Sequence, residues 1–311
     1  MVQASFGDAA IPQEHGNRWG AVVKIAVIGS TGQLGTDLVK TLSTTHEVIG
    51  FTHSDIEVAD YDSLMILKEQ HPDVVINTAA FHKTDQCEEE PQKTFCVNAL
   101  GARNIAQITA EIGATIVYIS TDYVFDGSKN EPYTEEDIPF PISTYGISKL
   151  AAEYFTQQNP KHYIMRIASV FGKAGASGKG GNFVETMINK AKNNDPIVVV
   201  DDMFMSPTYT RDAASVLKGI LELQLPYGVY HAANKGFCSW YQFAQEIFQA
   251  TKLSPDLKPT KSDPAYGKAR RPLFSALAST KLSRYNLEPR SWEDALRAYL
   301  LEKGHILKDS S

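Results

Sequence analysis

The sequence predicts an α/β protein with a doubly wound parallel sheet, followed by a smaller C-terminal lobe. Three observations carry this prediction: short apolar runs alternate with helical patterns over residues 21–170, the first run ends in spaced glycines, and the alternation then becomes irregular. The periodic pattern is absent from the glycine-rich residues 172–182 and from residues 252–272, which contain four prolines, and loops are expected there. With 311 residues, 43% of them hydrophobic, the chain can bury a full core.

The predicted strands are continuous apolar runs, which are typical of parallel strands covered on both faces. These runs span residues 22–29, 46–52, 73–80, 114–121, 162–171 and 196–200. Helical patterns separate them, for example over residues 33–43 and over residues 99–113, where Gly113 is a helix C-terminal signal. The alternation of the two patterns predicts parallel β-α-β winding.

Composition restricts the partners and the compartment. The formal charge of -6 and the pI near 5.8 give no overall basic field for nucleic acid, so a small molecule is the expected partner. No uncharged apolar stretch approaches the roughly 18 residues that span a bilayer, so no membrane partner is predicted. The three cysteines lack a C-x-x-C pair, which argues against disulfides and a zinc site and favours the reducing cytoplasm.

The first predicted strand ends in a turn that suits the phosphates of a dinucleotide. Gly29, Gly32 and Gly35 are spaced G-x-x-G-x-x-G at the opening of the first helix. Glycine permits positive φ and a close backbone approach to a pyrophosphate, whose charge is favoured by the free N–H groups of a helix N-terminus. A plain glycine-rich turn is the alternative, but the flanking strand and helix favour the dinucleotide.

The second predicted strand bears on the choice of cofactor. In NAD-binding units an acidic residue at the tip of this strand usually grips the ribose 2′-hydroxyl. Here residues 51–54 lack a carboxylate, and Asp55 follows them. Because no carboxylate repels a 2′-phosphate at the tip, NADP(H) is preferred, and NAD(H) is the alternative since no arginine is near.

The chain is accordingly divided into three parts. Residues 1–20 are predicted to be a flexible extension, because they carry charges and lack the apolar segment of a signal peptide. Residues 21–170 are predicted to be a dinucleotide-binding, Rossmann-type domain. Residues 171–311 are predicted to be mainly a substrate-binding lobe, with segments near 197–224 and 228–233 returning to the main sheet.

Tyr145 and Lys149 stand at i and i+4 on a predicted helix, so their side chains share one face. This spacing suits hydride transfer, because an ammonium lowers the tyrosine pKa from about 10 and can also hold the nicotinamide ribose. The tyrosine hydroxyl can then exchange a proton with the substrate oxygen. Tyr299 and Lys303 have the same spacing and are interpreted as an ordinary surface face, so spacing alone does not decide the matter.

The order of these signals resembles the extended short-chain dehydrogenase/reductase superfamily, with a phosphate loop, then Thr121 after the fourth strand, then the Tyr145 and Lys149 pair. Within it, the chain is similar to the dTDP-4-dehydrorhamnose reductase family from about Lys24 to Tyr299. The resemblance is carried by GSTGQLG, HPDVVINTAAF, VNALGARNIA, STDYVFDG, YGISKLAAE, GGNFVETM, SPTYTRDAA, GVYHAAN, SWYQFA and RRPLFSAL.

The resemblance implies NAD(P)H-dependent reduction of the 4-keto group of a nucleotide-activated 6-deoxy sugar, foremost dTDP-4-dehydrorhamnose to dTDP-rhamnose, a precursor of cell-surface polysaccharide. It implies that Tyr145 protonates the new alkoxide, that Thr121 hydrogen-bonds the same oxygen and that Lys149 tunes Tyr145. The implied cofactor-binding set is Gly29, Thr31, Gly32, Gln33, Leu34, Gly35, Asp55, Ile56, Ala79, Ala80, Phe81, Tyr145 and Lys149.

Three positions depart from the family pattern where the substrate is expected. Family members commonly carry a sugar-packing Trp where this chain has Ser169, a different sequence around His82, and an Asn where Phe274 stands. In the resemblance, Arg271 would pair with the pyrophosphate and Asn182 and Phe183 would hold and stack the base. A solvated loop, a surface arginine and loop packing are the alternatives at these places. The predicted substrate-binding residues are His82, Thr121, Asp122, Ser169, Asn182, Phe183 and Arg271.

Other functions on this scaffold stay open. A 4,6-dehydratase usually carries Asp and then Glu after the catalytic Thr, but here Asp122 precedes Tyr123, so elimination lacks its second carboxylate. An epimerase would share the Tyr-Lys core, and a non-catalytic subunit like the beta subunit of methionine adenosyltransferase is an alternative from another class. Some relatives dimerise through a magnesium-linked acidic interface. No carboxylate cluster distinctive enough for Mg²⁺ is found, so no metal is predicted, and a monomer or homodimer is expected.

Overall fold

The computed structural model describes residues 22–175, 181–263 and 267–307, so the predicted extension at residues 1–20 lies outside the described part. Within that part, six strands form one parallel sheet in the order β10-β5-β4-β3-β1-β2. They are β1 (Lys24–Ile28), β2 (Glu47–Phe51), β3 (Val74–Asn77), β4 (Thr115–Thr121), β5 (His162–Ile167) and β10 (Gly228–His231).

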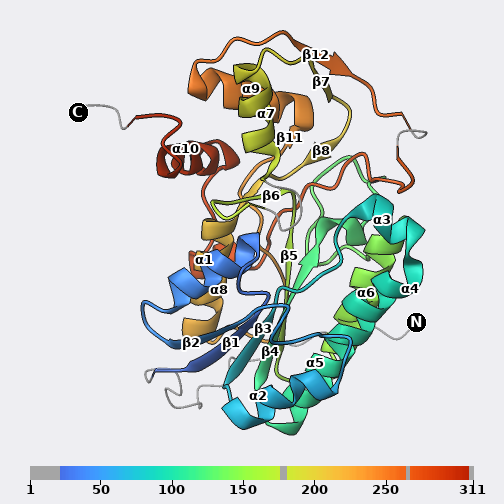
Figure 1. The fold of residues 1–311 in the computed structure, drawn as a ribbon, viewed down its shortest axis with the longest axis vertical. Helices are drawn as coiled ribbons and strands as arrows, with labels where there is room; N and C mark the ends of the chain where they lie inside the picture. The colour runs from blue at the N-terminus through green and yellow to red at the C-terminus, as the bar shows by residue number, and fades with distance from the viewer. Residues whose placement is uncertain (1–21, 176–180, 264–266, 308–311) are drawn as a thin grey trace, which may run out of the picture.

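Helices cover both faces of this sheet (Figure 1). On one face α1 (Gln33–Leu42) and α8 (Thr210–Glu222) pack together over an apolar cluster contributed by β1, β3, β4 and β5. On the other face lie α2 (Met65–Gln70), α5 (Gly101–Glu111) and α6 (Thr144–Thr156). The predicted fold class, a doubly wound parallel α/β sheet, is confirmed.

The strand sequences explain why both faces are covered. Successive side chains of a strand point to opposite faces, and in β1 Ile25 and Val27 enter the cluster beneath α1 and α8 while Ala26 and Ile28 enter the cluster beneath α2 and α5. All seven residues of β4 are buried. A continuous apolar run is therefore what this position in the sheet requires.

A second apolar core lies beyond the carboxyl edge of the sheet, in the upper part of Figure 1. It is built mainly from α7 (Phe183–Lys192), α9 (Trp240–Thr251) and α10 (Trp292–Glu302). Tyr299, expected on a surface face, is fully buried in this core. The assignment of residues 171–311 to a substrate-binding lobe stays a prediction.

Pairs of short strands border this second core. They are β6 (Val170–Phe171) with β9 (Thr208–Tyr209), β8 (Phe204–Met205) with β11 (Cys238–Ser239), and β7 (Ile197–Val200) with β12 (Leu257–Thr260). The last pair corrects two predictions, because β7 does not join the main sheet and part of the expected loop 252–272 is a strand. Ile197 and Val199 are buried while Val198 is 59% exposed, which is the alternation of a strand covered on one face only.

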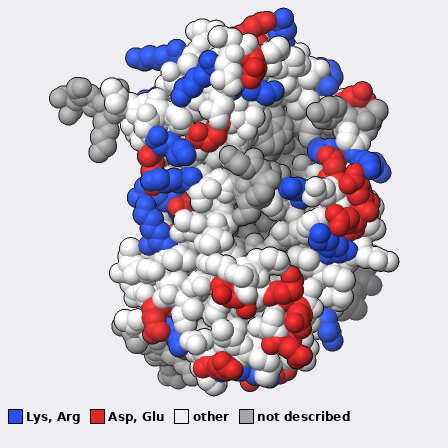
Figure 2. Space-filling model, in the orientation of Figure 1, with Lys and Arg blue, Asp and Glu red and all other residues white. Residues whose placement is uncertain are grey.

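The remaining elements are short. They are α3 (Thr84–Glu89), α4 (Pro91–Phe95), a π-helical turn η2 (Cys96–Leu100), and the 3-10 turns η1 (Asp62–Leu64), η3 (Asp122–Val124) and η4 (Leu282–Tyr285). None of the helices in the described ranges is long and apolar enough to cross a membrane. On the described residues of the face in Figure 2, acidic and basic side chains are interspersed.

Candidate active site

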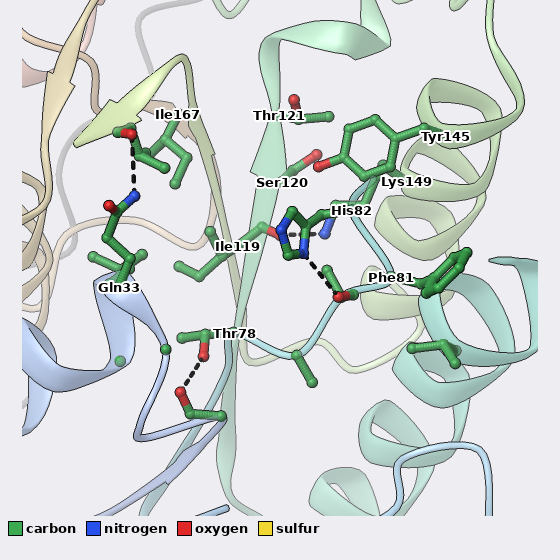
Figure 3. A pocket seen from close by; sticks show the side chains of 18 of the residues that line it. Gln33, Thr78, Phe81, His82, Ile119, Ser120, Thr121, Tyr145, Lys149 and Ile167 are labelled. Carbon is green, nitrogen blue, oxygen red and sulfur yellow. Dashed lines mark hydrogen bonds between the residues drawn. The ribbon is translucent and has the colours of Figure 1, made fainter. Parts of the chain in front are cut away.

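A cavity of about 800 Å³ lies at the carboxyl edge of the sheet, where β1, β3 and β4 end. Ligand sites of open α/β sheets occur at this edge, because the loops that follow parallel strands converge there. Its lining combines the turn after β1, the end of β4, the start of α6 and residues from the C-terminal half of the chain. Figure 3 shows how several of these side chains face one another.

The turn after β1 has the conformation that a phosphate loop requires. Gly29 has φ of +80°, and its N–H and that of Ser30 both donate to the Phe51 carbonyl of β2, at 2.9 and 3.0 Å. A Cβ added at Gly35 would lie 2.1 Å from the Gly29 oxygen, so only glycine permits this approach. Gly32 precedes α1 and no side chain caps the helix, which leaves its first N–H groups to an anion.

Neighbouring side chains hold this loop in place. Gln33 Nε2 donates to the Val170 carbonyl of β6 at 3.0 Å, and Thr78 Oγ1 donates to the Ile28 carbonyl at 2.7 Å (Figure 3). The residues after β3 form the adjoining wall, where the Phe81 N–H donates to Asn98 Oδ1 at 2.7 Å. All the predicted loop and wall residues line the cavity, namely Gly29, Thr31, Gly32, Gln33, Leu34, Gly35, Ala79, Ala80 and Phe81.

The structure separates Asp55 and Ile56, two residues that were predicted together on the adenine side of the cofactor. Ile56 lines the cavity, but Asp55 does not. The Asp55 carboxylate instead accepts the Thr52 hydroxyl at 2.6 Å and the Thr52 N–H at 2.7 Å, and these bonds hold its pKa below the usual value. Glu57, which was not predicted, lines the cavity beside His53, with 3.6 Å between its carboxylate and His53 Nε2.

The catalytic candidates lie together where β4 ends and α6 begins (Figure 3). Ser143 caps α6 by accepting the Gly146 N–H at 3.2 Å, which places Tyr145 in the first turn. A Cβ at Gly146 would lie 2.2 Å from the Tyr123 carbonyl oxygen, so glycine lets α6 approach the end of β4 closely. Thr121, at that end, lines the same part of the cavity as Tyr145.

Burial dominates the electrostatics of this group. It lowers the pKa of Lys149 to about 7, opposed by the Glu153 carboxylate, and it raises the pKa of Tyr145, opposed by the neighbouring Thr121 hydroxyl. The Lys149 ammonium donates to the Ile119 carbonyl at 2.6 Å, and its influence on the pKa of Tyr145 stays a prediction.

Asp122 connects the catalytic group to the C-terminal half of the chain. It lines the cavity and is 3% exposed, and its carboxylate accepts the Thr121 hydroxyl at 3.0 Å and the Ser275 hydroxyl at 2.5 Å. Burial raises its pKa to about 6, although both hydrogen bonds oppose the rise. Ser275 gave no signal in the sequence, because its role depends on a contact between residues 153 positions apart.

The predicted substrate-facing residues are only partly brought together. His82, Ser169 and Arg271 line the cavity, as do Thr121 and Asp122. The Arg271 guanidinium forms an ion pair with Asp85 at 2.7 Å, at the start of α3. An anionic ligand at Arg271 would therefore compete with an internal carboxylate.

Asn182 and Phe183 do not line the cavity, contrary to their predicted place at the substrate. Asn182 caps α7 by accepting the Glu185 N–H at 3.1 Å, and its amide donates to the Gly172 carbonyl at 3.0 Å. The Phe183 ring packs against Trp240 and Phe243 in the second core. Trp240, within the SWYQFA motif but given no role from the sequence, lines the cavity instead.

Among residues 22–175, 181–263 and 267–307, no group of three or more His, Cys, Asp or Glu side chains is arranged to hold a metal ion.

Comparison with known proteins identifies what the chain resembles as a whole. The family model described as RmlD substrate binding domain matches residues 23–304. The spore coat polysaccharide biosynthesis protein SpsK of Bacillus subtilis is 38% identical over 285 residues, which cover 91% of this chain and 98% of that protein. Crystal structures of two dTDP-4-dehydrorhamnose reductases also match, from Clostridium acetobutylicum and Bacillus anthracis, the latter in complex with NADP. They are 38% and 35% identical, each with a TM-score of 0.85, and each match covers 90% of this chain and 99% of the other.

Proposed function

This chain belongs to the dTDP-4-dehydrorhamnose reductase family, as its motifs predicted, and is an NAD(P)H-dependent oxidoreductase of the sugar-nucleotide type; we propose that it reduces dTDP-4-dehydrorhamnose to dTDP-rhamnose. One observation carries the proposal above the others. A single cavity contains a dinucleotide loop at the end of β1 and the Thr121, Tyr145 and Lys149 group at the end of β4. A hydride donor and a proton donor can therefore meet at one carbonyl group.

NADP(H) is the proposed cofactor, and it would supply the hydride when bound. The glycine turn suits its pyrophosphate, because no side chain caps α1 and the first N–H groups of the helix are left for an anion. Ile56 and the wall from Ala79 to Phe81 would border the adenosine and the nicotinamide half. Lys149, now 2% exposed, would turn its ammonium from the Ile119 carbonyl toward the nicotinamide ribose.

The proposed chemistry is a proton transfer timed with hydride arrival at C4. Tyr145 donates its proton to the carbonyl oxygen as negative charge develops there. Thr121 has one hydroxyl proton, which Asp122 accepts in the structure, so Thr121 can donate to the substrate oxygen only when that bond is released. A protonated Asp122 would donate to Thr121 and free the Thr121 proton for the substrate. We therefore assign Asp122 an influence on how Thr121 is oriented.

The substrate is proposed to lie between this group and the C-terminal wall. Arg271 is the cation suited to its diphosphate, in exchange for Asp85. Ser169 and His82 line the same space, and they would contact the hexose without the aromatic packing that a Trp provides. We further propose that the enzyme works in the cytoplasm as a monomer or homodimer.

The proposal is tested by following oxidation of NADPH and NADH with a panel of dTDP-, UDP- and GDP-linked 4-keto-6-deoxy sugars. The expected result is turnover of dTDP-4-dehydrorhamnose with NADPH, and formation of dTDP-rhamnose, identified by NMR of the sugar. Turnover of another nucleotide sugar in preference to this one would contradict the substrate. Cofactor binding without oxidation against the whole panel would contradict the reaction.

A further inference from the structure

Trp240 brings an aromatic ring to the cavity from the C-terminal half of the chain. It is half-buried and lines the same cavity as Ser169 and Arg271. Phe183, the ring expected to stack the base, packs into the second core, and Phe274 is buried beside Phe204. The cavity is therefore bordered by an aromatic ring from the C-terminal half of the chain, but the ring is that of Trp240, whereas the sequence predicted Phe183 to stack the base.

The backbone of Trp240 is fixed before any ligand arrives. It is the first residue of α9, where Ser239 accepts the Gln242 N–H at 3.1 Å and the Gln242 side chain accepts the Ser239 N–H at 2.8 Å. The Trp240 N–H itself donates to the Met203 carbonyl at 3.2 Å, next to the pairing of β11 with β8. A ring carried by such a helix start loses little freedom on binding.

The indole is also supported from the side of the second core. Its centroid lies 4.7 Å from that of Phe183 at an angle of 59°, and Phe183 stacks on Phe243 at 5.6 Å and 12°. This arrangement holds the indole against other rings while it borders the cavity. It is the arrangement expected of a stacking platform, because a supported ring presents a fixed surface to a planar ligand.

The other aromatic rings on the cavity wall belong to its reacting or cofactor side. Tyr123 packs edge-on against Tyr145 at 5.9 Å, and Phe81 lies after β3 with the Lys93 ammonium 4.8 Å from its centroid. The C4 carbon of the hexose must reach Tyr145, and the nucleoside extends from it through the diphosphate. The nucleoside end therefore suits the lining contributed by the C-terminal half of the chain, which includes Arg271 and Trp240.

We propose that the indole of Trp240 is the surface on which the pyrimidine base of the nucleotide-sugar substrate stacks. The inference rests on the proposed reductase function and assigns the part of the substrate that Trp240 recognises. Because every base has a π-face, the platform contributes affinity, and discrimination among bases falls to polar contacts elsewhere.

The test measures binding of dTDP, which contains the base and the diphosphate but no hexose, to the full chain saturated with NADPH. Trp240→Leu removes the ring and keeps an apolar side chain against Phe183, whereas Trp240→Phe keeps a smaller ring. By calorimetry we expect Trp240→Leu to weaken dTDP binding by about tenfold or more and Trp240→Phe by only a few-fold. NADPH affinity should be the same in all three proteins, which also shows that the variants fold.

Tryptophan emission gives a second readout. The chain contains three tryptophans, Trp19, Trp240 and Trp292, and Trp292 is buried beside Phe243. The change in emission on adding dTDP should persist in Trp292→Phe and disappear in Trp240→Phe. Loss of the change in both variants, or in neither, would contradict contact between the base and Trp240.

The outcomes separate this inference from the proposed function. Unchanged dTDP affinity in Trp240→Leu overturns the platform, whatever the enzyme reduces. Weakened kinetics on the keto sugar with unchanged dTDP binding overturns it too, because the ring would then contact the hexose. If the wild type binds UDP or GDP but not dTDP, the proposed substrate is wrong. The affinities of Trp240→Leu and Trp240→Phe for the nucleotide that does bind then test the platform. Binding of none of the three overturns the platform, while turnover still decides the function.

Discussion

The Nζ atom of Lys149 lies 4.2 Å from the centroid of the Tyr118 ring, between α6 and β4. The π-face of Tyr118 and the Ile119 carbonyl both stabilise the ammonium form, and the carboxylate of Glu153 on the next turn of α6 does the same. Burial acts in the opposite direction and lowers the pKa of Lys149 to about 7. The charge state of Lys149 therefore depends partly on Tyr118, which does not line the cavity.

Tyr118→Leu should shift the basic limb of the pH profile of kcat/KM to lower pH by about one unit, because a cation–π contact no longer stabilises the Lys149 ammonium. Tyr118→Phe is the matched control, since the Tyr118 hydroxyl has no hydrogen-bond partner among the described residues. Steady-state kinetics across pH checks this prediction. Superimposable profiles for the two variants would show that the ring does not influence Lys149.

Tyr145→Phe should lower kcat by roughly 10²- to 10⁴-fold, because the proposed proton donor is removed. NADPH affinity should be unaffected, as measured by titration of the protein with the cofactor. Tyr154→Phe on the same helix is the control, since Tyr154 is 60% exposed. Turnover retained in Tyr145→Phe would exclude Tyr145 as the donor.

Asp122→Asn should make the protein more stable than the wild type at high pH. Burial raises the pKa of the Asp122 carboxyl to about 6, above its usual value of 3.8. The protonated Asp122 carboxyl therefore contributes fully to stability below the unfolded-state pKa, and this contribution is lost as pH rises through about 6. The unfolding free energy of the variant, relative to the wild type, should rise by about 2–3 kcal/mol between pH 4 and pH 8.

Urea denaturation at several pH values checks the prediction for Asp122. Ser275→Ala provides a test in the other direction, because it removes a hydrogen bond that lowers the carboxyl pKa. In that variant the loss of stability should extend to higher pH than in the wild type. A difference between Asp122→Asn and wild type that is constant from pH 4 to pH 8 would contradict the raised pKa.

Arg166→Leu should destabilise the protein by about 3–5 kcal/mol, because it leaves the Glu153 carboxylate buried without its cation. Arg166 and Glu153 are 4% and 1% exposed and form hydrogen bonds at 2.6 and 2.9 Å. Lys258→Ala is the control, since its ion pair with Asp256 is of similar length, 2.8 Å, but exposed. Denaturation midpoints compare the two, and equal midpoints would show that burial of the pair is unimportant.

Local sequence patterns predicted the main sheet and the glycine turn after β1 because both are encoded by neighbouring residues. The run from Thr115 to Thr121 is apolar enough to be covered by helices on both faces of the sheet, and every residue of β4 is buried. Gly29 and Gly35 meet in one turn only six residues apart in the sequence. Tyr145 and Lys149 share a helix face for the same reason.

Residues whose place depends on packing between distant segments were harder to predict. Phe183 and Trp240 are both aromatic and both start a helix, and only the packing of α7 on α9 decides which one meets the cavity. The pairing of β7 with β12 joins Ile197 to Leu257 across a stretch in which prolines indicated loops. Asp55 carries the acidic group expected of a cofactor site, but its carboxylate accepts two hydrogen bonds from Thr52 instead.

Tyr145, Lys149 and Asp122 all lie in surroundings that oppose their charged forms. Tyr145 is uncharged at neutral pH and bears no cost for this, whereas Lys149 and Asp122 must either lose their charge or keep it without full hydration. Replacing these two residues by an amide or an apolar side chain of similar size should therefore raise the melting temperature while lowering turnover.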